Sequence, residues 1–152
     1  MHVTSFQLEA LPPYSFELTV HNPAGWYWYN PLEVFSDGRI WAALRLSSEA
    51  VVGLRLESLG SVDRPRVLAT VFSRQKLKDT EMAEAADMVV ECAGLDEDLT
   101  GFYEEVGEDP VLRYAIEDLY GMKRGAILRS DVFRSAILAI TLQNAPIKRT
   151  DQ

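Results

Sequence analysis

The sequence has 152 residues, of which 47% are hydrophobic and 25% charged, and its formal net charge is −8 at pH 7. This length can bury a sizeable core for one domain or slightly more, as expected of a soluble globular protein. A single cysteine excludes an internal disulfide. There is also no apolar run of about 18 residues and no leader with a basic and then an apolar segment, so the sequence favours a cytoplasmic protein without a membrane span.

The charge is distributed unevenly along the chain. Residues 1–119 contain 21 of the 23 acidic residues but only 9 of the 15 basic ones, whereas residues 120–152 contain 2 acidic and 6 basic residues. The net charge therefore changes from −12 in the first part to +4 in the second. We expect any contact with a polyanion to be confined to the basic end.

The first part of the sequence shows the pattern of a sheet. Between Tyr14 and Val20, apolar and polar side chains alternate, which predicts a half-buried strand. Asp37-Gly38 predicts a turn. Further strands are predicted at residues 39–46, 51–57 and 66–72, with a loop at residues 59–65. Because short connections without a helical pattern join these strands, we expect an antiparallel sheet.

From about Thr80 onward the apolar residues recur at helical spacing. Met82, Ala86, Val89 and Ala93 fall on one side of a helix, and carboxylates occupy the opposite side. Gly94 is a typical residue to end such a helix. We expect this helix to pack on one face of the sheet, with Cys92 as a packed residue rather than a reactive thiol.

Two shorter helices are predicted next, at residues 96–106 and 109–120, with Pro110 at the first position of the second and Gly121 after its end. The acidic cluster at residues 96–98 lies at a helix start, where the helix dipole favours carboxylates. We interpret it as charge complementation rather than a metal site. His2 and His21 are too few and too isolated for a metal site or a catalytic triad, and there is no glycine-rich phosphate loop, so we expect no cofactor.

The last predicted helix, at residues 132–140, is apolar on nearly all sides. Such a helix is typically enclosed by others. The preceding helices are too short to enclose it, so we expect the natural protein to continue beyond Gln152. The uncovered helix would then favour association of two copies of the present chain.

Several segments together resemble a known family. These are residues 95–103, Asp109-Pro110, residues 119–122, residues 131–133 and residues 139–144. They resemble the front half of the helix-hairpin-helix (HhH-GPD) DNA glycosylases, of the 3-methyladenine and 8-oxoguanine type. The resemblance implies an α+β fold, with a TATA-binding-protein-like antiparallel sheet and packed helix at residues 1–94. The first helices of an all-α HhH-GPD domain would follow at residues 95–152.

The resemblance also implies a DNA-binding site near the end of the chain. In the family, the turn after the buried helix enters the minor groove and fills the space of the flipped-out nucleotide, and here that turn is Gln143-Asn144-Ala145. Arg149, next to Lys148, matches the position that reads the orphaned cytosine, because a guanidinium can donate two hydrogen bonds in one plane. Asn144 and Arg149 favour an oxidised purine opposite cytosine over an alkylated one. Each also has a simpler interpretation: a helix C-cap for Asn144 and a solvated surface charge for Arg149.

The sequence departs from the family in two respects. Arg134 follows Phe133 where the family often has Glu, so a salt bridge from that position is in doubt. The family's hairpin and its catalytic Asp or Lys lie beyond the aligned region, and cleavage of an N-glycosidic bond needs such groups.

From the resemblance we predict that the parent protein is a cytoplasmic, nucleoid-associated base-excision-repair enzyme acting on double-stranded DNA with a damaged base. The present chain alone should be inactive.

Two alternatives remain at the level of sequence. The aromatic residues at positions 26–29 could stack nucleobases, although in a strand one pair of them would face the core. The whole chain could instead be a non-enzymatic interaction module of sheet and helices, whose C-terminal helix packs against a protein partner.

Overall fold

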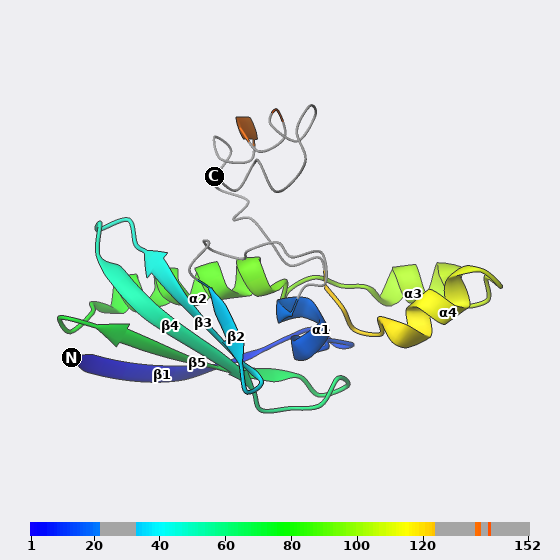
Figure 1. Ribbon diagram of the computed structural model, residues 1–152, viewed down its shortest axis with the longest axis horizontal. Coiled ribbons are helices and arrows are strands. Elements are labelled where there is room, and N and C mark those ends of the chain that lie inside the picture. Colours follow the sequence, from blue (N-terminus) through cyan, green and yellow to red (C-terminus); the bar gives the residue numbers. More distant parts are fainter. Residues whose placement is uncertain (22–32, 124–135, 138–139, 141–152) are drawn as a thin grey trace.

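The computed structural model describes residues 1–21 and 33–123, together with Ala136, Ile137 and Ile140. In this part of the chain, the fold is α+β: a five-stranded antiparallel sheet is accompanied by four helices (Figure 1). None of the helices described is long and apolar enough to cross a membrane. The helices expected at residues 124–152 lie outside the described residues, apart from the helical positions Ala136, Ile137 and Ile140.

The sheet has the strand order β1-β5-β4-β3-β2, and every neighbouring pair is antiparallel. The strands are β1 (His2–Glu9), β2 (Val34–Ser36), β3 (Arg39–Arg45), β4 (Val51–Ser58) and β5 (Arg66–Ser73). The predictions for β3, β4 and β5 are confirmed to within one residue at each end. The Asp37-Gly38 turn is also confirmed, since both residues have positive φ, 53° and 70°, as a tight hairpin turn requires. β1 and β2 were not predicted.

The predicted strand at Tyr14–Val20 is wrong, because this segment contains the short helix α1 (Phe16–Val20). The hydroxyl of Ser15 accepts a hydrogen bond from the backbone N–H of Leu18 at 3.4 Å and thereby caps the helix. The buried residues of α1 are Phe16, Thr19 and Val20, which lie three and four positions apart. The alternation in the sequence was therefore too short to distinguish a strand from one helical turn.

The long helix α2 (Asp79–Ala93) packs on one face of the sheet and forms the core with it, as predicted (Figure 1). Gly94 ends α2 in the left-handed conformation, with φ 61°. The buried face differs slightly from the prediction, because Ala85 and Cys92 are fully buried while Ala86 is half-buried. Cys92 is thus a packed residue, as expected.

The last two helices, α3 (Thr100–Val106) and α4 (Leu112–Asp118), are shorter than predicted. The carboxylate of Asp98 accepts from the N–H of Thr100 at 2.9 Å. Asp109 accepts from the N–H groups of Val111 and Leu112 at 2.7 and 2.9 Å. These acidic residues lie just outside the helices and bind their free N–H groups, so the predicted starts at residues 96 and 109 are three to four residues early.

Candidate functional site

Gly121 fixes the segment after α4 to the sheet-containing part of the molecule. Its carbonyl oxygen accepts from the N–H of Ser15 at 2.7 Å, and its own N–H donates to the hydroxyl of Tyr103 at 2.9 Å. Gly121 has φ +78°, and a Cβ added there would lie 2.9 Å from Val62 Cγ1. The position therefore requires glycine, both for its backbone conformation and for the close approach of α1 and the β4–β5 loop.

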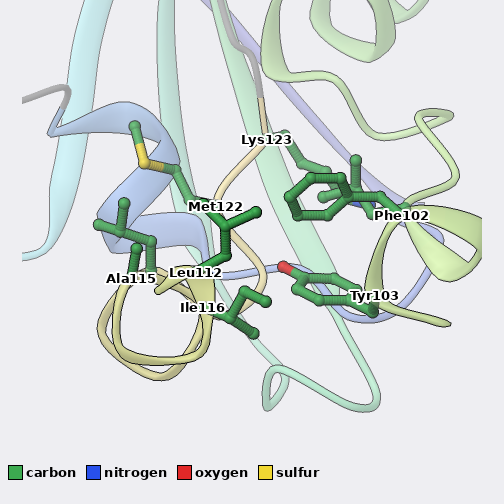
Figure 2. A pocket seen from close by; sticks show the side chains of 9 residues that line it. Phe102, Tyr103, Leu112, Ala115, Ile116, Met122 and Lys123 are labelled. Atoms are coloured by element: carbon green, nitrogen blue, oxygen red, sulfur yellow. The ribbon is translucent and has the colours of Figure 1, made fainter. Parts of the chain in front are cut away.

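α3 and α4 extend away from the sheet and enclose an apolar pocket between them (Figures 1 and 2). The pocket has a volume of about 370 Å³. It is lined by Leu99, Phe102, Tyr103, Leu112, Ala115, Ile116, Leu119, Met122 and Lys123. Neither helix contains a fully buried residue, and Phe102 is 51% exposed. This pocket therefore presents apolar surface that could receive apolar side chains or an apolar ligand group.

Lys123 borders the pocket and is only 1% exposed. Its backbone N–H donates to Thr19 Oγ1 at 3.0 Å, and its ammonium group donates to the carbonyl oxygen of Glu97. Burial lowers the pKa of Lys123, and the nearby carboxylates of Glu97 and Asp98 oppose that shift. Lys123 thus connects α1, the segment before α3 and the pocket.

The acidic residues near the pocket have structural roles. The N–H of Thr100 lowers the pKa of the Asp98 carboxyl, and the N–H groups of Leu112 and Val111 do the same for Asp109. A carboxylate that accepts such hydrogen bonds is stabilised as the anion and complements the start of a helix. This confirms the predicted helix-terminal role for Asp98. Within the described ranges, no group of three or more His, Cys, Asp or Glu side chains is arranged to hold a metal ion.

No protein-family model matches the sequence, and neither does any curated protein. Among solved structures, the fold is similar to that of a 3-methyladenine DNA-glycosylase from Archaeoglobus fulgidus, with 18% sequence identity and a TM-score of 0.65. The similarity covers 96% of this chain and 47% of that one. The chain has a DNA-glycosylase-like fold. It spans about half the length of the glycosylase, and at this identity the likeness concerns the fold alone.

The glycosylase-like fold does not by itself place the site residues predicted from the sequence. Gln143, Asn144, Lys148 and Arg149 all lie outside the described residues, as does the aromatic segment at residues 26–29. Their roles stay predictions.

The pocket and the burial of Lys123 were not predicted. Helices were predicted at residues 96–106 and 109–120, but the sequence did not indicate that their side chains line a common pocket. Nothing local marks Lys123 as buried, because its partners Thr19 and Glu97 are 104 and 26 positions away.

Proposed function

We propose that this chain is the N-terminal part of a base-excision-repair DNA glycosylase, which flips a damaged purine out of double-stranded DNA and cleaves its N-glycosidic bond. The observation that carries the proposal is the similarity of 96% of the chain to a 3-methyladenine DNA-glycosylase. The segments at residues 95–149 that resemble HhH-GPD enzymes support it independently, since they were identified from the sequence. Residues 1–94 would be the sheet domain, and residues 95–152 would begin the helical domain.

The distribution of charge supports a DNA contact at the end of the chain. Residues 120–152 carry a net charge of +4, whereas the body is acidic, so the phosphate backbone would be attracted to that end. In this proposal Gln143 and Asn144 enter the minor groove and fill the gap left by the flipped base. Arg149 reads the opposite cytosine, and Lys148 contacts a phosphate. Neither a metal nor another cofactor is required.

Binding of duplexes with an abasic-site analogue opposite cytosine or opposite adenine tests these roles. We expect Arg149→Ala to weaken binding opposite cytosine by about tenfold and binding opposite adenine much less, because the lost hydrogen bonds are specific to cytosine. Arg113→Ala is the matched control, since Arg113 is an exposed arginine of α4 that stacks on Tyr114. Equal losses on both duplexes would contradict base reading by Arg149.

Catalysis is proposed to need groups beyond this chain. Near the pocket, Asp98 and Asp109 bind helix N–H groups, and no Asp or Glu among the described residues lines the pocket itself. We therefore expect the 152-residue chain to release no base from an oligonucleotide containing 8-oxoguanine or an alkylated purine. Release of either base by the purified chain would contradict this expectation.

The apolar pocket between α3 and α4 favours a second candidate function, that of a non-enzymatic interaction module. An exposed apolar pocket of this kind is typical of a surface that binds another protein element. The module would bind a partner or a second copy of the chain, for which the exposed Ile137 and Ile140 offer further apolar surface. Sedimentation of the purified chain, together with the duplex-binding experiment, separates the two functions: the module predicts association without selective DNA binding.

A further inference from the structure

The sheet has a second face, opposite α2, whose side chains differ in kind from those of the core. On β4 the side chains of Val52, Leu54 and Leu56 point toward α2 and are buried, so the alternate residues point to the other side. The cross-strand pairing places a consistent set of residues there. We call it the outer face, and its central residues are Trp41, Arg55, Glu57, Thr70 and Phe72.

An aromatic and arginine cluster lies at the centre of the outer face. The rings of Trp41 and Phe72 are stacked with centroids 6.0 Å apart, and the guanidinium of Arg55 lies 5.5 Å from the centroid of Trp41. Arg55 is held in place by Thr70 Oγ1 at 3.3 Å and by the carboxylate of Glu57 at 3.1 Å. Trp41 is nevertheless 41% exposed. The cluster therefore holds an indole ring in a fixed orientation while part of the ring remains open to solvent.

A pocket of about 300 Å³ adjoins this cluster. Met1, Val51, Phe72, Ser73 and Arg74 line it, and Phe72 is shared with the cluster. Arg45 belongs to the same edge, because it is paired across the strands with Val51. Arg45 has an ion pair with Glu49, but both side chains are at least 70% exposed, so this pair holds the arginine only weakly.

The outer face is more basic than its surroundings. Arg39, Arg45 and Arg55 project from it and Arg74 lies at its edge, whereas Glu57 is the carboxylate at its centre, shared between Arg39 and Arg55. By contrast, α2 on the other side of the sheet contains five acidic residues and no lysine or arginine. In a chain of net charge −8, the two sides of the sheet thus differ in sign. This polarity favours an anionic ligand on the outer face.

We propose that the outer face binds single-stranded nucleic acid, with bases stacked on Trp41 and Phe72 and phosphates bound by Arg45 and Arg74. Trp41 is exposed and Phe72 half-buried, and rings of this kind on a sheet, flanked by arginines, provide the two interactions that single strands need: base stacking and backbone neutralisation. A duplex hides the faces of its bases from such a surface. The residues of this site are different from those proposed to read the duplex, at residues 143–149, and the inference does not depend on the proposed glycosylase function.

The direct experiment measures binding of a fluorescently labelled single-stranded oligothymidylate to the full chain by fluorescence anisotropy. We expect Trp41→Ala to weaken binding by about tenfold, and Trp41→Phe to remain within about threefold of the parent, because a phenyl ring still stacks. Tyr114→Ala is the matched control. Tyr114 is 63% exposed on α4 and has an arginine, Arg113, 5.2 Å from its ring centroid, but it lies away from the outer face.

The contribution of the arginines is tested by the salt dependence of the same binding. Arg74→Gln should reduce the slope of log K against log salt concentration by about 0.7, as expected when one phosphate contact to a single strand is lost. The proposal would be overturned by an absence of binding by the parent chain at low salt, by an equal loss with Trp41→Phe and Trp41→Ala, or by an equal loss with Tyr114→Ala. A Trp41→Ala chain that changes oligomeric state without nucleic acid would also overturn it, by assigning the face to self-association. Arg149→Ala should leave this binding unchanged, which separates it from the duplex contact.

Discussion

Lys123 is the only charged residue among the fully buried residues of the described chain, and its ammonium group donates to the backbone carbonyl oxygen of Glu97. Burying a charge is costly, and the nearby carboxylates of Glu97 and Asp98 offset only part of that cost. We therefore expect Lys123→Met, which keeps the packing of the side chain, to leave stability unchanged or to increase it. Lys123→Ala should instead lower the free energy of unfolding by about 2–4 kcal/mol through the cavity it creates. Urea unfolding of the three proteins measures both effects.

The pH dependence of stability isolates the ammonium group of Lys123. Burial lowers the pKa of Lys123 in the folded state, whereas its unfolded pKa is about 10.4. Between these two values the unfolded chain binds more protons, so the parent protein gains stability relative to Lys123→Met as the pH rises. The free energy of unfolding of the parent protein, relative to that of Lys123→Met, should therefore be larger at about pH 10 than at about pH 8. If the difference in free energy of unfolding between the two proteins does not depend on pH, the Lys123 ammonium group is not buried as a charge in the folded state.

Gly121 and Gly101 form a matched pair of glycines. Gly121 has φ +78° and no room for a Cβ, whereas Gly101 lies in α3 with open space around it. Gly121→Ala should destabilise the fold by about 1–3 kcal/mol, and Gly101→Ala should stabilise it by about 0.5–1 kcal/mol because alanine favours a helix. Thermal unfolding of both variants tests this. Similar changes in melting temperature for the two would show that Gly121 does not fix α3 and α4 to the sheet.

The helices and strands that were predicted best from the sequence are those in which one apolar periodicity continues over many residues. α2 and strands β3 to β5 were predicted because their apolar patterns run for seven residues or more. β1 was missed although Phe6 and Leu8 alternate with polar residues, because its other two inward positions are occupied by His2 and Thr4. α1 was assigned wrongly because a segment of five residues is compatible with the apolar period of a strand and with that of a helix. Its helical state depends on the cap at Ser15 and on burial against distant residues.

The N-cap of α1 can be tested by substitution of Ser15. Replacing Ser15 by Ala removes the acceptor for the N–H of Leu18 and should destabilise the fold by about 1 kcal/mol, whereas Ser15→Asp should retain most of the stability. Because Gly121 and Lys123 also bind this segment, we expect α3 and α4 to become less protected in hydrogen exchange in the Ala variant. If Ser15→Ala and Ser15→Asp lower stability equally, the hydroxyl does not act as a helix cap.

At the scale of the whole molecule, the structure combines a closed sheet-and-helix core with a helix pair whose apolar pocket is exposed. In the core, strands β3, β4 and β5 and the packed helix α2 could be predicted from their local patterns, whereas β1, β2 and α1 could not. The pocket of the helix pair could not be predicted from the sequence, because it is formed by residues from two helices and by Lys123, which long-range contacts bring together. The similarity to a DNA glycosylase places this arrangement in a larger enzyme only as a proposal.

We propose that the chain belongs to an enzyme that recognises a gap in duplex DNA. The most direct measurement compares the affinity of the 152-residue chain for an undamaged duplex and for the same duplex with an abasic-site analogue opposite cytosine. We expect binding to the abasic duplex to be tighter by about tenfold, and we expect Asn144→Ala to lose this difference, because Asn144 can fill the gap only where a base is missing. Equal affinity for the two duplexes would contradict the proposal that the protein recognises a gap in duplex DNA.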